Sequence, residues 1–93
     1  MKPIKSFELF GLTITVRRVG ADELPHNTVG FYDPGAEEIL ILKTQTSDAQ
    51  LQTFLHEFYH AAFQGLGRND LNDDEVIVDT LASLTHQMLK TAK

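Results

Sequence analysis

The sequence has no cysteine, few basic residues and no long hydrophobic run. Without cysteine there is no disulfide framework and no thiolate metal site, and this composition suits a cytoplasmic protein. Eight Lys and Arg against thirteen Asp and Glu give a net charge of −5, whereas nucleic-acid binding needs clustered cations. No apolar stretch approaches the ~18 residues that span a membrane. We therefore expect a cytoplasmic protein that binds neither nucleic acid nor membrane.

The length of the chain limits its organisation. With 93 residues, the sequence predicts one domain over residues 1–93, with a modest hydrophobic core. The first twenty residues carry early lysines and then an apolar stretch that a glutamate interrupts, which predicts a strand and not a signal peptide. Hydrophobic residues in this stretch alternate with polar residues or glycine, as in a half-buried strand: Phe10, Leu12, Ile14 and Val16.

A β-hairpin is predicted in the middle of the chain. After a loop over residues 20–27, we expect short strands at residues 28–32 and 38–43. Between them, Asp33-Pro34-Gly35 offers a proline that sets φ at one turn position and a glycine that takes positive φ at the next. The run Ile39-Leu40-Ile41-Leu42 is apolar on both faces, so we expect that strand to be covered on both sides.

A helix is predicted over residues 48–64. Ser47 and Gln50 form a capping box at its start, and Gly65 or Gly67 is expected to supply a left-handed residue at its end. Its core face follows from helical spacing: Leu51, Leu55, Phe58 and Ala62. The aromatic residues of this segment are assigned to the core and not to a substrate pocket: Phe54, Phe58 and Phe63.

A second helix is predicted from an N-terminal signal, Asn72 with Glu75, to about Thr91. Lysines at its end suit the negative end of the helix dipole. Its core face is expected to comprise six apolar residues: Ile77, Val78, Leu81, Leu84, Met88 and Leu89. The predicted fold class is thus α+β, a small antiparallel sheet of about three strands, including the hairpin, packed on two helices.

The first of these helices carries the motif His56-Glu57-Phe58-Tyr59-His60, an H-E-x-x-H sequence. Residues four apart project from the same face of a helix, so His56 and His60 can present two imidazoles to one metal ion. Glu57 lies beside them, where a carboxylate can act as general base on a water molecule. The motif predicts a Zn²⁺ site.

A third protein ligand is needed, because catalytic zinc takes three and leaves one position for water. Glu75 lies three residues before Val78 and seven before Ala82, so it is expected to project toward the first helix. Asp79 follows one turn later and could accept a hydrogen bond from a ligand histidine. Glu75 also stands where a capping box needs it, and Asp79 therefore remains a rival ligand.

The two motifs together, H-E-x-x-H followed after a short loop by E-x-x-x-D, resemble those of the gluzincin metallopeptidases. The order and small size are similar to the ImmA/IrrE-type and phage-encoded minimal members, over roughly residues 28–91. The resemblance implies that Glu75 is the third zinc ligand and that Asp79 steadies a ligand histidine. It implies Glu57 as the general base. The chain lacks the extra helices and lower subdomain of larger relatives, and Tyr32, Tyr59 and His26 are candidates for stabilising the oxyanion.

The predicted activity is that of a zinc metallo-endopeptidase, in which Glu57 is the base for a water that zinc activates. The alternative is a non-catalytic domain that zinc stabilises and that binds a peptide or protein, with Asp79 or His26 as fourth ligand. The strand at residues 39–42 is expected to lie beside the metal cleft and to pair with an extended substrate. His86 is expected to be a solvated or capping residue. The substrate and the oligomeric state are left open.

Overall fold

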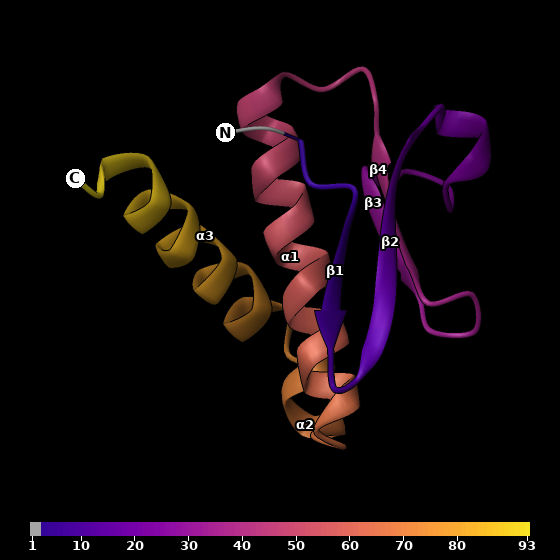
Figure 1. Cartoon of the computed structure of the whole chain (residues 1–93), viewed down its shortest axis with the longest axis vertical. Helices are drawn as coiled ribbons and strands as arrows, with labels where there is room; N and C mark the ends of the chain where they lie inside the picture. Colours follow the sequence, from indigo (N-terminus) through magenta and orange to yellow (C-terminus); the bar gives the residue numbers. More distant parts are fainter. Residues whose placement is uncertain (1–2) are drawn as a thin grey trace.

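The computed structural model of the protein describes residues 3–93. Helix α1 lies between a β-sheet on one side and helix α3 on the other (Figure 1). Residues 3–93 form four strands, one 3₁₀ turn and three α-helices: β1 Ser6–Leu9, β2 Leu12–Val19, η1 Ala21–Glu23, β3 Gly30–Asp33, β4 Glu38–Leu42, α1 Ser47–Gly65, α2 Asn69–Asn72 and α3 Glu75–Thr91. The α+β class is confirmed.

The sheet is mixed and has four strands in the order β1-β2-β4-β3. The pairs β1–β2 and β3–β4 are antiparallel, as the hairpin prediction requires, but β2 and β4 are parallel. The prediction of an antiparallel sheet of about three strands was therefore wrong in both respects. The segment between β2 and β3 crosses over the sheet, and β4 then returns to lie beside β2. Local sequence patterns carry no information on where such a hairpin docks.

The N-terminal segment, predicted as one strand, forms a hairpin of two strands, β1 and β2. Phe10 and Gly11 both have positive φ, 52° and 77°, which matches a two-residue type I′ turn. Phe10 is therefore a turn residue, 55% exposed, and not the first residue of an alternating strand. The inward positions of β2 are Ile14 and Val16, as predicted, and both are buried.

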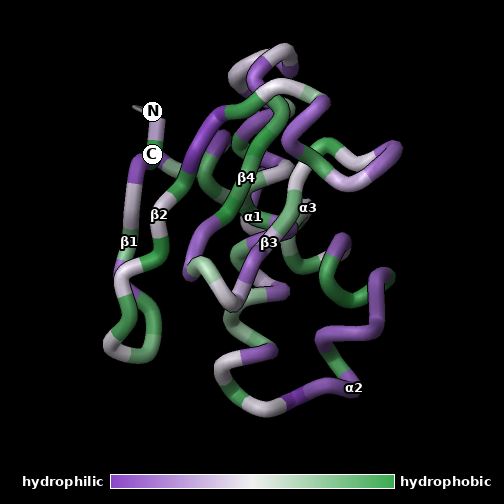
Figure 2. The backbone as a smooth tube through the Cα atoms, turned by 90° about the vertical axis from the view of Figure 1, so that its right-hand side faces the viewer, coloured by the Kyte–Doolittle hydropathy of each residue, from purple (hydrophilic) through white to green (hydrophobic). Residues whose placement is uncertain are grey.

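The strand β4 is central and is covered on both faces, as its sequence predicted. Ile39 and Ile41 are fully buried in the cluster that joins the sheet to α1. Leu40 faces the opposite side and packs with Val19 and with Leu24, from the segment after η1. Figure 2 shows β4 as a hydrophobic stretch within the fold. A central strand has no free edge, so residues 39–42 cannot pair with a substrate, and that prediction was wrong.

The N-cap of helix α1 lies one residue earlier than the predicted cap, Ser47. Thr46 is the N-cap, and its side chain accepts a hydrogen bond from the backbone N–H of Ala49 at 3.1 Å. At the other end Gly67 has φ +71°, and the N–H groups of Gly67 and Arg68 bond to the carbonyls of Gln64 and Phe63. This is a Schellman motif, so Gly67 and not Gly65 supplies the left-handed residue.

The core face of α1 was predicted in part. Leu55 is buried, whereas Leu51 and Phe58 are half-buried and pack against the main cluster. Phe54 and Phe63 are buried, which confirms their assignment to the core.

Helix α3 makes a narrower contact than its sequence predicted. Only Val78 and Ala82 are buried along it. Leu84, Met88 and Leu89, all expected in the core, are 58%, 53% and 38% exposed. The reason is geometric, because α3 contacts the rest of the fold mainly through α1, and a single helix can cover only one face of another. None of the helices among residues 3–93 is long and apolar enough to cross a membrane.

Candidate metal centre

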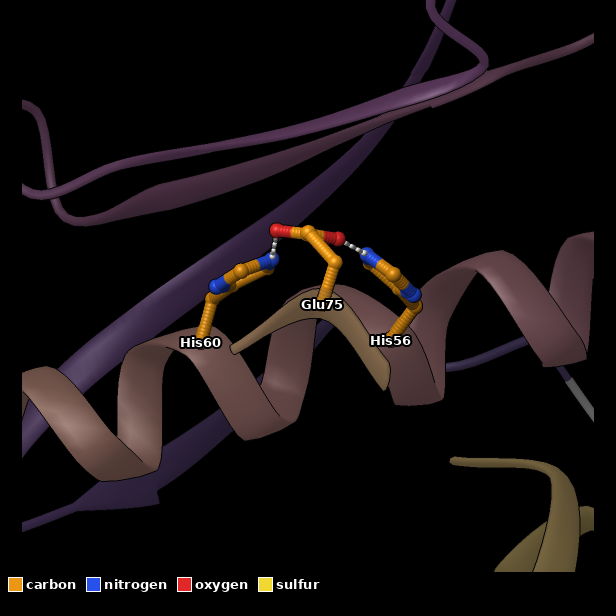
Figure 3. A group of neighbouring side chains, drawn as sticks. All are labelled: His56, His60 and Glu75. Carbon is orange, nitrogen blue, oxygen red and sulfur yellow. Dashed lines mark ion pairs between the residues drawn. The ribbon is translucent and has the colours of Figure 1, made fainter. Parts of the chain in front are cut away.

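Three side chains converge between α1 and α3: His56, His60 and Glu75 (Figure 3). The Nε2 atom of His56 lies 3.1 Å from one carboxylate oxygen of Glu75, and the Nε2 atom of His60 lies 3.0 Å from the other. The two histidine side chains are 23% and 18% exposed, and that of Glu75 is 65% exposed. The cluster is thus anchored on the helix interface and open to solvent on one side.

The separations within this cluster fit a divalent metal ion. A tetrahedral ion with bonds of ~2.0–2.1 Å holds its ligand atoms about 3.3 Å apart. One potential ligand atom from each of His56, His60 and Glu75 can be chosen so that all lie within 4.8 Å of one another. Two imidazoles and a carboxylate are also a donor set that zinc accepts at catalytic sites. These three residues could therefore hold a metal ion, and in the chain from residue 3 onward no other such group of three occurs.

The other ring nitrogen of each histidine, Nδ1, also has an oxygen atom nearby. The Nδ1 atom of His56 lies 3.4 Å from a carboxylate oxygen of Asp79, and the Nδ1 atom of His60 lies 2.7 Å from the side-chain oxygen of Asn72. An oxygen acceptor favours the proton on Nδ1, which leaves the Nε2 lone pair free for a metal. The Asp79 carboxylate thus faces Nδ1 of His56, and its role beside a metal ligand stays a prediction. Asn72 was missed in this role, because its sequence position suggested a helix cap.

The position of Glu75 follows from how α3 begins. Asp74 is the N-cap, and its side chain accepts a hydrogen bond from the N–H of Ile77 at 3.1 Å. Glu75 is therefore the first residue of the helix and not the third residue of a capping box, so its carboxylate is free to face the histidines. Val78 and Ala82 are fully buried, which turns this side of α3 toward α1 as predicted.

The side chain of Glu57 extends from α1 toward the strand β3. The backbone of Tyr32 forms a hydrogen bond with its carboxylate, and burial raises the pKa of Glu57 above its ordinary value of 4.5. His56 and His60 partly oppose this increase in pKa, while the carboxylate of Glu75 adds to it. A carboxyl group with a raised pKa, adjacent to a candidate metal site, is suited to accept a proton.

Gly30 permits this close approach of β3 to α1. A Cβ atom at Gly30 would lie 2.4 Å from Cγ2 of Thr53 and 3.3 Å from Cγ and Oε2 of Glu57. The strand is at the edge of the four-stranded sheet, so one side of its backbone has no strand partner among the described residues. A hollow of about 360 Å³ adjoins it. Its lining includes the polar side chains Asn27, Thr28, Gln52, Thr53 and Asp79, together with Glu57 and His56 of the motif.

The other candidate residues lie away from the group formed by His56, His60 and Glu75. The hydroxyl of Tyr59 lies 2.7 Å from that of Thr85 on α3, so it joins the two helices. His86 contacts Gln52 at 2.8 Å and Asp48 at 3.1 Å, both on α1. The prediction of a solvated or capping residue was therefore wrong, because the His86 side chain is only 16% exposed and joins α3 to α1. His26 is exposed in the loop before β3. Neither histidine belongs to the group formed by His56, His60 and Glu75.

Comparisons with protein families, with curated proteins and with solved structures find no match to this chain.

Proposed function

We propose that this protein is a zinc-dependent metallo-endopeptidase in which His56, His60 and Glu75 bind Zn²⁺ and Glu57 is the general base. The observation that supports it best is the position of Glu57. Its carboxylate is half-buried beside β3 and next to two histidines whose Nε2 atoms converge on Glu75. The sequence resemblance to gluzincins points to the same assignment. The absence of cysteine supports a reducing compartment such as the cytoplasm.

Each residue has a distinct task in this proposal. Bound zinc would lower the pKa of a water molecule toward ~7 and polarise the carbonyl of the substrate. Glu57 would take the proton of the attacking water and pass it to the leaving amine, a role typically worth ~10²–10⁴ in rate. Asp79 and Asn72 would keep the proton of each ligand histidine on Nδ1.

The substrate in this proposal is an extended peptide that pairs with β3. In the β3–β4 ladder the N–H of Leu42 bonds to the carbonyl of Val29. Hydrogen bonds in an antiparallel pair point alternately toward and away from the partner strand, so the backbone groups of Gly30 and Tyr32 point away from β4, toward the open edge. The N–H of Tyr32 meets Glu57 there, which leaves the groups of Gly30 and the carbonyl of Tyr32 for an added strand. An added strand there would lie along the metal cluster. The hollow lined by Gln52 and Thr53 would receive one of its side chains.

The alternative, a non-catalytic zinc-stabilised binding domain, is less well supported. Structural zinc sites usually fill all four positions with protein ligands. The cluster offers three, and Asp79 contacts Nδ1 of His56, the nitrogen on the opposite side of the ring from the one that faces Glu75. Glu57 would also have no task in such a domain, although its burial has an energetic cost.

A test compares the parent with Glu57→Gln and with Glu8→Gln, a change at an exposed position of β1. Bound zinc is measured by mass spectrometry, and cleavage of an unfolded protein is followed with and without chelator. We expect Glu57→Gln to retain zinc and fold but to lose hydrolysis by ~10² or more, while Glu8→Gln behaves as the parent. Retained hydrolysis in Glu57→Gln would refute the mechanism. Zinc without hydrolysis in the parent would favour the binding domain.

A further inference from the structure

Helix α3 carries an apolar surface that the rest of the chain leaves uncovered. Four residues at successive spacings of four, three and four lie on one side of the helix: Ile77, Leu81, Leu84 and Met88, here called the α3 stripe. Leu84 and Met88 are 58% and 53% exposed, and Ile77 and Leu81 are half-buried. The side of α3 that faces α1 is formed by Val78 and Ala82, which have no exposed surface. The α3 stripe is therefore a second apolar side of the same helix.

We infer that the α3 stripe binds the α3 stripe of a second copy of this chain, in an antiparallel helix pair with two-fold symmetry. Contiguous apolar surfaces of this kind mark interaction sites, and two-fold dimers are the commonest protein oligomers. The inference concerns a different side of α3 from the one that carries Glu75 and Asp79, and it does not depend on the proposed catalytic activity.

The order of residues in the stripe is symmetric, which suits a copy of itself. Read from either end, the spacing is four, three and four. A two-fold axis between Leu81 and Leu84 places Leu81 of one copy opposite Leu84 of the other, and Ile77 opposite Met88. Every residue of the stripe then meets another apolar residue, as an isologous interface requires. Spacings of three and four are also those of helices that pack by inserting side chains between one another.

The charge at the two ends of α3 favours the antiparallel direction. The helix starts next to Asp73 and Asp74, and it ends next to Lys90 and Lys93. An antiparallel pair brings the acidic start of one copy alongside the basic end of the other, whereas a parallel pair would bring like charges together. Lys90 also contacts Asp48 of its own chain at 2.8 Å, so Lys93 is the freer of the two cations. The helix dipoles oppose each other in the same antiparallel arrangement.

Single cysteines test the geometry directly, because the chain has none of its own. In the inferred pair the two copies of Leu84 lie three residues apart along the axis, about 4.5 Å, while those of Met88 lie eleven apart, roughly 16 Å. We therefore expect Leu84→Cys to form a covalent dimer on mild oxidation and Met88→Cys to remain largely monomeric. Both side chains are more than half exposed, so neither change should unfold the protein, and circular dichroism verifies this. Equal dimer yields from the two variants, or no dimer from Leu84→Cys, would overturn the inference.

Sedimentation equilibrium of the unmodified chain provides a second test. We expect a dimer whose dissociation constant rises at least about tenfold in Leu84→Glu, because a buried charge would have no partner. Val76→Glu is the matched control, since Val76 is 76% exposed on the same helix but lies about 100° away from the stripe. A chain that stays monomeric up to millimolar concentration, or a dimer that Leu84→Glu leaves intact, would refute the proposal.

Discussion

The Nδ1 atom of His60 lies 2.7 Å from the side-chain oxygen of Asn72. This contact links the metal cluster to the end of α2, a helix of only four residues. Asp74 caps α3, so Asn72 does not serve as the cap and its amide is free to approach the histidine. The corresponding atom of His56 faces Asp79. Each imidazole of the candidate metal site therefore has an oxygen partner at its Nδ1 atom.

Asn72→Ala should weaken zinc binding by ~10–100-fold without changing the number of ions bound, because His60 would lose the acceptor that fixes its proton on Nδ1. The measurement is a competition titration against a chelator. Asn69→Ala is the matched control, since Asn69 is an exposed residue of the same short helix. Equal affinities in the two variants would show that the contact with His60 does not orient the ring.

Two alanine substitutions should show whether Glu75 or Asp79 binds the metal ion. They are Glu75→Ala and Asp79→Ala. Glu75 faces both Nε2 atoms, whereas Asp79 faces only Nδ1 of His56. Glu75→Ala should therefore lose zinc at chelator concentrations that the parent withstands, while Asp79→Ala should keep zinc with affinity reduced ~10–100-fold. Metal titration of both variants provides the comparison. If Asp79→Ala empties the site and Glu75→Ala leaves it filled, the two assignments are reversed.

The sequence predicted those parts of the site that depend on local spacing. A helix places His56 and His60 on one side, and the burial of Val78 and Ala82 orients Glu75 toward them. The signal for the β3–β4 hairpin was also local, because its turn residues and its apolar run lie within a few residues of each other in the sequence. These features follow from the periodicity of one element at a time.

The parts that escaped prediction depend on how elements dock. Residues 39–42 were expected to meet the substrate, but the parallel pairing of β4 with β2 leaves β3 at the edge. Asn72 had the sequence pattern of a cap, and only the break before α3 directs it to His60. The apolar residues Leu84 and Met88 were expected in the core, since periodicity identifies an apolar face without showing what covers it.

Gly30→Ala should disturb the alignment of β3 with Glu57. The new Cβ would lie 2.4 Å from Cγ2 of Thr53, so the edge strand must move away from α1, at a cost of about 1–3 kcal/mol in the free energy of unfolding. If the proposed activity holds, the rate of hydrolysis should fall with it. Gly35→Ala serves as control in the same hairpin, because its Cβ meets nothing closer than 3.4 Å. Thermal unfolding of both variants distinguishes them, and equal melting temperatures would contradict the packing at Gly30.

The last prediction uses the raised pKa of Glu57 in the metal-free protein. Burial is its main cause, so the folded state holds the Glu57 proton more tightly than the unfolded state does. A raised pKa contributes stability that is complete below the unfolded value, 4.5, and that is lost as pH rises through the folded value. Glutamine stays neutral at every pH. Glu57→Gln should therefore melt at a higher temperature than the parent near neutral pH.

The difference should shrink as the pH falls below the ordinary pKa of a glutamate, because the parent carboxyl is then protonated in both states. Melting temperatures in chelator across this pH range measure it. Glu8→Gln, at an exposed position, should show no such dependence on pH. An excess stability of Glu57→Gln that grew toward acid pH would require a lowered pKa. The Glu57 carboxylate would then be stabilised by its neighbours instead of being held ready to accept a proton.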